Sequence, residues 1–76
     1  MNELELMREF GRRLKYELDQ RWMSQKELSL ETGLSTSTIS YYINGERMPT
    51  LKNVLNIAYA IDCSIEDLVV TGEHIY

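Results

Sequence analysis

The chain has little of what several classes of protein need. It contains one cysteine, one proline and four glycines in 76 residues. A single cysteine cannot form an internal disulfide, which argues against a small disulfide-stabilised secreted scaffold. Scarce proline and glycine, together with 43% hydrophobic residues, argue against a disordered chain. We therefore expect one small globular domain over 1–76, with a tail at 71–76.

Two further absences concern location. No apolar run approaches the roughly 20 residues that a membrane-spanning helix needs. The first six residues, Met-Asn-Glu-Leu-Glu-Leu, are acidic and lack the basic start of a signal peptide. We therefore expect a cytoplasmic protein that does not associate with membranes.

Positive charge is also scarce, because the net charge is −4 at pH 7. The excess of acid lies entirely in residues 54–76, which have four acidic side chains and neither lysine nor arginine. Residues 1–53 carry eight acidic and eight basic side chains and are neutral overall. A polyanion such as DNA would therefore approach the first two-thirds of the chain.

Hydrophobic spacing and capping residues predict a compact all-α fold with five helices. Apolar residues three and four apart predict a first helix from Leu4 to about Asp19, in which Gly11 is slightly unfavourable. Cap residues predict four more helices. These run from Gln25 to Thr32 after Ser24, from Thr36 to about Asn44 after Ser35, from Leu51 after Thr50, and from Ile65 to about Val70 after Ser64.

Three further structural expectations concern the fourth helix, Cys63 and Trp22. In the fourth helix, one face is expected to contain Leu51, Val54, Leu55, Ala58 and Ile61. Cys63 is expected to be a small buried residue before the last helix. Trp22, in the loop before Ser24, is expected to pack on the edge of the domain.

The second and third predicted helices are short and are joined by about three residues that include glycine. This is the arrangement of a helix-turn-helix, here over about 24–45, in which the second helix lies in the major groove of DNA. The geometry directs five residues inward or into the turn: Leu28, Gly33, Leu34, Ile39 and Tyr42. By exclusion, the outward face of the second helix has Thr36, Ser37, Ser40 and Tyr41. Short hydroxyl side chains let a helix approach base edges closely, so we expect these four residues to contact bases.

Several short segments also match a known family. They are Ser24-Gln25, Glu27-Leu28, Gly33-Leu34-Ser35, Ile39-Ser40, Asn44-Gly45-Glu46-Arg47 with Pro49, and Ser64-Ile65-Glu66-Asp67-Leu68. With these segments, residues 10–70 resemble the Cro/cI-type helix-turn-helix of phage repressors and their bacterial relatives, often called the XRE family. The resemblance implies a lambda-repressor-like DNA-binding domain.

The resemblance also implies roles for individual positions. It implies phosphate contacts from Ser24, Gln25, Asn44 and Arg47, and base contacts from the four outward residues of the third helix. In the family, the residue matching Gln25 often also braces the one matching Thr36. Ser29 and Thr32 depart from the family pattern, which has a small and an apolar residue there. Leu18 and Ile43 stand where many phage relatives pair an Arg with a Glu, and the change removes a phosphate contact while leaving the fold intact.

These patterns predict a transcriptional regulator that binds double-stranded DNA. We expect a small repressor of phage or prophage type, acting as a homodimer on a pseudo-palindromic operator. The dimer contact is expected in the last helix and tail, at Leu68, Val69, Val70, Ile75 and Tyr76. The alternative is a protein-interaction module, such as an antitoxin or anti-repressor subunit. The net acidity, Leu18 and Trp22 favour this alternative.

Other function classes lack support in the sequence. There is no Ser/His/Asp triad pattern, paired-carboxylate pattern or glycine-rich phosphate loop, so we expect no enzyme, cofactor or small-molecule ligand. His74 has no second ligand nearby, so we expect no metal site. Arg8, Arg12 and Lys15 alternate with acidic residues and are expected to form a solvated face of the first helix.

Overall fold

The computed structural model describes residues 1–70, and within them the chain forms five α-helices and no strand. These are α1 (Glu3–Gln20), α2 (Gln25–Thr32), α3 (Thr36–Ile43), α4 (Leu51–Ile61) and α5 (Ile65–Leu68). The predicted all-α fold is confirmed. The expected tail at 71–76 lies outside the described residues.

The predicted caps begin and end the helices. The side chains of Ser24, Ser35 and Thr50 each accept a hydrogen bond from the backbone N–H three residues later. Gly33 and Gly45 have φ angles of 78° and 70°, the left-handed conformation that favours glycine after a helix. Local chemistry therefore sets the boundaries of α2 and α3.

The fifth helix is shorter than predicted. It ends at Leu68, and Val69 has φ −121° and ψ 148°, an extended conformation. With this extended backbone, the side chain of Val70 is buried, and Val70 lines the same groove as Phe10 of α1. Tertiary packing therefore overrides helical spacing at this end.

The predicted face of α4 is partly wrong. Leu51 and Leu55 are 70% and 45% exposed, whereas Ile57, which was not assigned to that face, is fully buried. The buried positions are Val54, Ile57, Ala58 and Ile61, which follow the i, i+3, i+4, i+7 spacing of one helical stripe. Leu51 and Leu55 lie on the flank of that stripe.

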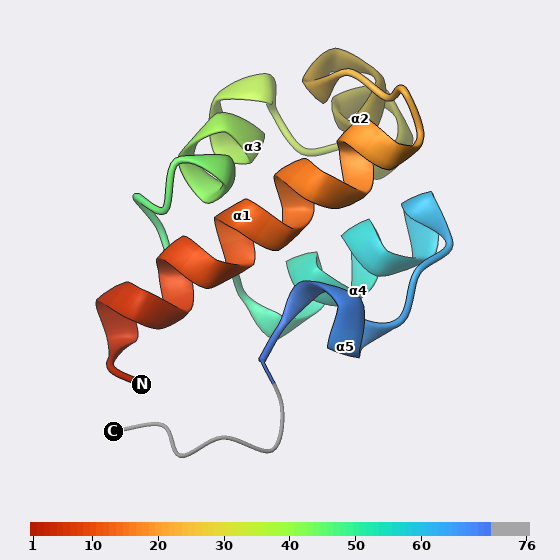
Figure 1. The fold of residues 1–76 in the computed structure, drawn as a ribbon. Helices are drawn as coiled ribbons and strands as arrows, with labels where there is room; N and C mark the ends of the chain where they lie inside the picture. Colours follow the sequence, from red (N-terminus) through yellow and green to blue (C-terminus); the bar gives the residue numbers. More distant parts are fainter. Residues whose placement is uncertain (71–76) are drawn as a thin grey trace.

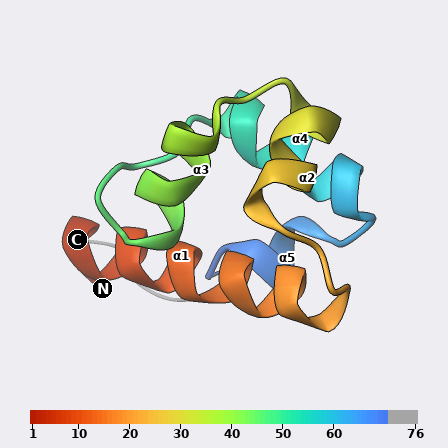
Figure 2. The same ribbon diagram turned by 90° about the horizontal axis from the view of Figure 1, so that it is seen from above.

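Helix α1 crosses the domain and contacts both α3 and α5, while α2 contacts α3 and α4 (Figure 1). Seen from above, α2 and α3 lie beside each other over α1 (Figure 2). All five helices contribute to one core, made of Phe10, Leu14, Leu18, Leu28, Ile39, Tyr42, Val54, Ile57, Ala58, Ile61 and Leu68. Among residues 1–70, no helix has the length and apolar character needed to cross a bilayer.

Trp22 does not pack on the domain edge as expected. Its side chain is 94% exposed, and its φ is 54°, a left-handed conformation that is unusual for a bulky residue. The backbone takes this conformation because the N–H groups of Trp22 and Met23 bond to carbonyls at the end of α1. The helix-ending turn therefore holds an indole in solvent.

Gly11 has a structural reason that the sequence did not reveal. A Cβ atom at Gly11 would collide with the backbone carbonyl oxygens of Tyr42 and Ile43, at the end of α3. The backbones of α1 and α3 are therefore in close contact at this residue. Gly33 differs, because no atom lies within 4 Å of the position of a Cβ there.

Helix propensity and packing predict opposite effects of Gly11→Ala on stability. Gly11→Ala should lower the free energy of unfolding by about 1–3 kcal/mol, the usual cost of overpacking. Helix propensity alone would make the same change stabilising by about 1 kcal/mol. Chemical denaturation measures the difference. Gly33→Ala is the matched control and should cost only about 1 kcal/mol, from its left-handed backbone. A stabilised Gly11→Ala protein would contradict the close contact.

Candidate nucleic-acid interface

Hydroxyl side chains fasten the turn between α2 and α3. Ser29 Oγ donates a hydrogen bond to the Leu34 carbonyl at 2.5 Å, and Thr32 Oγ1 accepts one from the Leu34 N–H at 3.2 Å. Asn56 of α4 donates from Nδ2 to the Thr32 carbonyl at 2.8 Å. Ser29 and Thr32, the departures from the family pattern, therefore replace apolar packing with hydrogen bonds that fix the turn.

Two buried residues fix the rotation of α3 about its own axis. Ile39 and Tyr42 belong to the core, as predicted. The Tyr42 ring meets Phe10 edge to face, with centroids 5.8 Å apart, and its hydroxyl accepts a 2.8 Å hydrogen bond from Asn53 Nδ2. Tyr42 therefore ties α3 to both α1 and α4, and this sets which residues of α3 point outward.

The structure brings the four predicted base-contacting residues together on the open side of α3. Thr36 and Ser37 are exposed, while Ser40 and Tyr41 are half-buried. Their side-chain hydroxyls make no hydrogen bond to any other residue within 1–70. Each hydroxyl can therefore donate and accept with a ligand. The face carries no charge, because α3 has no acidic or basic residue.

Two of the predicted phosphate-contacting residues lie at the start of α2. Ser24 Oγ accepts the Glu27 N–H at 3.0 Å, and the Glu27 carboxylate accepts the Ser24 N–H at 3.2 Å, which completes the predicted capping box. The Ser24 hydroxyl proton remains available for a ligand. Gln25 is half-buried and, among residues 1–70, its side chain makes no hydrogen bond. The resemblance implied that Gln25 braces Thr36, but within 1–70 no hydrogen bond joins these two residues.

The other two, Asn44 and Arg47, lie at the far end of α3. Asn44 is the C-cap residue of α3 and is exposed. Arg47 is also exposed, and its guanidinium carbon lies 4.1 Å from the centroid of the Tyr41 ring. The two predicted pairs therefore lie at the ends of two helices, one at the start of α2 and the other at and after the end of α3.

Arg8 was assigned to the solvated face of α1, but it differs from its neighbours. Arg12 is ion-paired with Glu9, and Lys15 with Asp19. The pKa of Glu9 is lowered, first by its hydrogen bond from Arg13 and then by Arg12, with burial acting against both. Within 1–70, Arg8 has no ion pair, and its side chain lies against Gly45 beside Asn44. The sequence did not distinguish Arg8 from Arg12 and Lys15, because the contact of Arg8 with Gly45 depends on the fold of the turn after α3.

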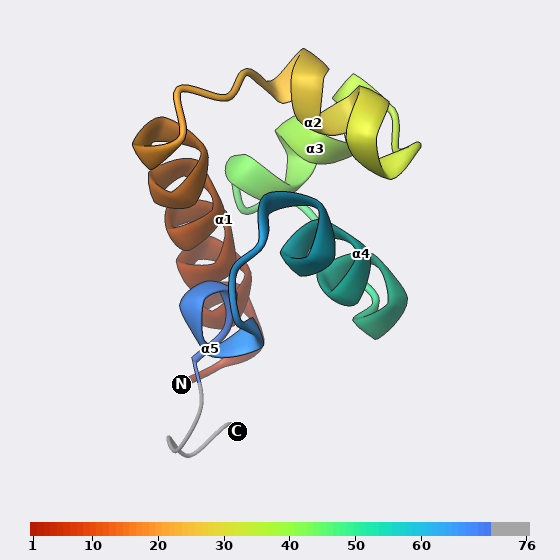
Figure 3. The same cartoon turned by 90° about the vertical axis from the view of Figure 1, so that its right-hand side faces the viewer.

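The acidic helix α5 lies away from this face. Asp62, Glu66 and Asp67 belong to the end of α4 and to α5, and Figure 3 places α5 at the opposite end of the domain from α2 and α3. Glu66 and Asp67 of α5 therefore lie away from the candidate DNA face. Glu27 and Glu31, however, belong to α2, and Glu46 closely follows α3. Leu18 is buried and Ile43 packs against the same core, so the positions of the family's ion pair are apolar here.

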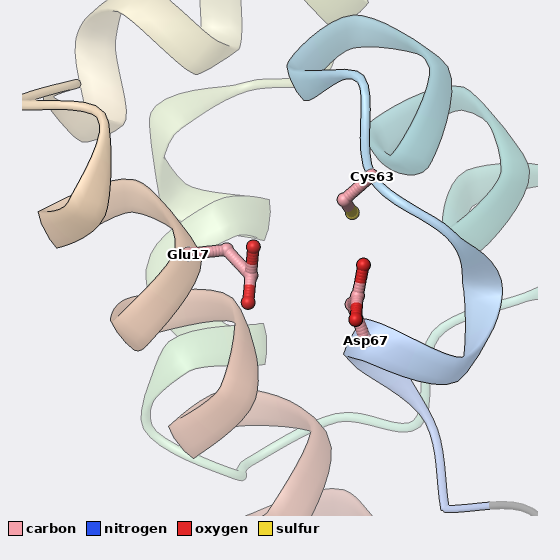
Figure 4. A group of neighbouring side chains, drawn as sticks. All are labelled: Glu17, Cys63 and Asp67. Atoms are coloured by element: carbon pink, nitrogen blue, oxygen red, sulfur yellow. The ribbon is translucent and has the colours of Figure 1, made fainter.

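A second cluster of polar side chains lies between α1 and α5. Ligand atoms of Glu17, Cys63 and Asp67 lie within 4.8 Å of one another (Figure 4). Each carboxylate already has a partner, since Glu17 is paired with Arg21 and Asp67 accepts the Ser64 N–H. Burial, and then the nearby Glu17 charge, raise the pKa of the half-buried Cys63 thiol and disfavour the thiolate that binds metals. The cluster is best explained as part of the packing between α1 and α5.

Comparison with known proteins agrees with this geometry. The family model HTH_3, described as a helix-turn-helix, matches residues 14–68. The chain belongs to the HTH_3 family. The resemblance stated from the sequence is therefore confirmed, and the matched segment contains the whole of α2, the turn and α3.

Two regulatory proteins are similar to this chain over more than half of its length. The cryptic phage CTXphi transcriptional repressor RstR of Vibrio cholerae is 36% identical over 45 residues, which cover 59% of this chain and 40% of RstR. The chain therefore spans about two fifths of that relative. The crystal structure of the restriction-modification controller protein C.AhdI from Aeromonas hydrophila has a TM-score of 0.78 at 31% identity. It covers 82% of this chain and 94% of C.AhdI.

A second solved structure supports the fold alone. An HTH_3 family transcriptional regulator from Vibrio cholerae has a TM-score of 0.83 at 21% identity, over 87% of this chain and 37% of that one. The five-helix arrangement of this HTH_3 domain is therefore shared with larger regulators.

Proposed function

We propose that this HTH_3 protein is a transcriptional regulator that binds double-stranded DNA by inserting α3 into the major groove. The observation that carries the proposal is the outward face of α3, where four side-chain hydroxyls have no hydrogen-bond partner within 1–70. Hydroxyls of Ser and Thr can donate to or accept from base edges, and the Thr methyl can touch a thymine methyl. Tyr42 and the hydrogen-bonded turn hold this face in one orientation.

Phosphate contacts position such a helix without specifying sequence. We assign this role to Ser24, Gln25, Asn44 and Arg47, and add Arg8 because it is unpaired within 1–70 and adjoins Asn44. A further proposal is that the protein represses transcription by occupying an operator. It draws support from the similarity to RstR, a transcriptional repressor. We expect neither catalysis nor a bound small molecule to be needed for this action.

The rival function is that of a protein-interaction module. It is favoured by exposed aromatic side chains, since Trp22 is 94% and Tyr59 89% exposed. Aromatic side chains on the surface are typical anchors of protein interfaces. The net charge of −4 also weakens non-specific attraction to DNA.

Selection of bound sequences from a pool of random duplexes at low salt separates the two functions. We expect an enriched pseudo-palindrome whose half-sites are centred about 34 Å apart, one turn of the double helix. Ser37→Ala should relax base preference at one position of each half-site, because a base contact specifies sequence. Gln25→Ala should weaken binding to all selected sites alike, because a phosphate contact does not.

One control variant and two possible outcomes make this selection decisive. Tyr59→Ala changes an exposed residue away from α3 and should leave the selected sequence and its affinity unchanged. Failure to enrich any sequence at low salt would overturn the DNA-binding proposal in favour of the rival. Equal effects of Ser37→Ala and Gln25→Ala on base preference would overturn the division between base and phosphate contacts.

A pseudo-palindromic site requires a second protomer, and the structure revises where it would contact the first. Leu68, one of the residues expected in the dimer contact, is fully buried in the core and is not accessible to a partner. Ile75 and Tyr76 lie outside the described residues. Val69 remains, because it is half-buried and lines an apolar groove between α1, α4 and α5, to which the buried Val70 also belongs.

We propose that this groove receives a second copy of the chain. All of its lining residues are apolar, among them Leu6, Met48 and Leu51. Two copies of a chain with net charge −4 repel each other, so an uncharged surface is the favourable place for them to meet. Leu51 is 70% exposed at this groove and can enter the groove of the partner, while the partner's copy enters the first in a two-fold symmetric contact.

Sedimentation equilibrium of the full chain tests this contact. Leu51→Glu should shift the protein from dimer toward monomer, because it buries an unpaired carboxylate in the apolar contact. Tyr59→Glu is the matched control on α4, since Tyr59 is 89% exposed and does not line the groove, and it should leave the dimer intact. A wild-type protein that is monomeric at all concentrations would overturn the proposal and leave the groove to another occupant, such as residues 71–76. Equal dissociation by both variants would contradict the location.

A further inference from the structure

The turn that ends α3 places Arg47 against Tyr41. The N–H of Glu46 bonds to the Tyr41 carbonyl at 2.8 Å, and the N–H of Gly45 bonds to the Tyr42 carbonyl at 3.1 Å. With Gly45 at φ 70°, these two bonds form a Schellman motif, which reverses the chain after a helix. The reversal returns residue 47 to the level of Tyr41 on α3, and the guanidinium carbon of Arg47 lies 4.1 Å from the ring centroid.

This turn has little freedom to relax. A Cβ at Gly45 would lie 3.0 Å from Cγ and 3.1 Å from Cα of Arg8, so the turn is pressed against α1. Gly45 is buried, although its neighbours Asn44 and Glu46 are exposed. The position of Arg47 is therefore set by the core through α1, and the Tyr41 ring sets where its side chain ends.

The contact between Arg47 and Tyr41 occupies some groups of these two side chains and leaves others free to bind a ligand. A guanidinium that lies over a ring uses its flat face, and its N–H donors remain in the plane, free for a phosphate oxygen. The same contact covers one face of the Tyr41 ring, so a base cannot stack on that face. The hydroxyl of Tyr41 stays without a hydrogen bond within 1–70 and is the group left to contact a base.

We propose that Tyr41 is a positioning residue for Arg47. Its ring holds the guanidinium ready for a backbone phosphate at the end of α3, while only its hydroxyl contacts bases. Arg47 has no acidic partner within 1–70 that could hold it instead. This inference rests on the proposed DNA binding. It adds that removing the uncharged ring of Tyr41 lowers the affinity for every DNA sequence, because the ring no longer holds Arg47 in place.

A double-mutant cycle on the full-length protein tests this coupling. Tyr41→Leu, Arg47→Ala and the double variant are measured against a selected operator and against a scrambled duplex of equal length, over a range of salt. Tyr41→Leu should weaken binding to the scrambled duplex by about two- to five-fold for each protomer. On the operator, it should show this loss together with the loss of base preference that Tyr41→Phe also shows. It should also reduce the slope of log K against log salt by up to about 0.9 per protomer, the value of one phosphate contact. Once Arg47 is alanine, Tyr41→Leu should have little further effect on the scrambled duplex.

Tyr41→Phe is the conservative control. It keeps the ring, so it should keep the wild-type salt slope and lose only preference between bases. The inference is overturned if the effects of Tyr41→Leu and Arg47→Ala are additive on the scrambled duplex. It is equally overturned if Tyr41→Phe lowers the salt slope as much as Tyr41→Leu does.

A measurement without DNA separates this inference from the proposed function. In NMR spectra, the ring should shift the side-chain signals of Arg47 upfield in the wild type and in Tyr41→Phe, and the shift should vanish in Tyr41→Leu. The amide spectrum of each variant shows whether it remains folded. A ring shift in a protein that binds no duplex contradicts the proposed function alone. Absence of the ring shift in the wild type contradicts the stack itself.

Discussion

The presentation of α3 depends on the contact at Gly11, where the backbone of α1 meets the last carbonyl groups of α3. This contact fixes the depth at which α3 sits, and Tyr42 fixes its rotation through Phe10 and Asn53. The hydrogen bonds of Ser29 and Thr32 fix its start, and the turn at Gly45 fixes its end. With all of these set by the core, the outward residues of α3 have no role in folding that would use their hydroxyls.

The placement of charge follows from the same architecture. α3 carries no charged residue, so it approaches DNA without a strong electrostatic attraction of its own. Four cationic side chains have no ion pair within 1–70, namely Arg8, Lys26, Arg47 and Lys52, and of these Arg8 and Arg47 lie on either side of the turn at Gly45. In the proposed complex, Arg8 and Arg47 contribute electrostatic affinity at the end of α3, and the hydroxyls of its outward face contribute sequence preference. The acidic residues of α5 are held at the opposite end of the domain.

The sequence was sufficient for the helices because local signals define them. Ser24 with Glu27, and Gly33 with its left-handed backbone, are determined by neighbours a few residues away, so α2 and its boundaries were predictable. Tertiary effects were not. Gly11 resembled a weak helix residue until α3 lay against it, Ile57 was missed because Leu51 and Leu55 matched helical spacing as well, and Val69 left the helix so that Val70 could be buried. The outward residues of α3 could be predicted by excluding those that face the core. The contact of Arg47 with Tyr41 could not, because it depends on a backbone reversal that sequence spacing does not encode.

NMR titration of the protein with a selected operator duplex shows whether DNA contacts the open face of α3. If it does, the largest amide shift changes should fall at the start of α2, across Thr36 to Tyr41, and at Asn44 to Arg47. Residues around Trp22 and Tyr59 should change little. Large changes confined to those two aromatic residues, with α3 unaffected, would contradict the account and support a protein-interaction role.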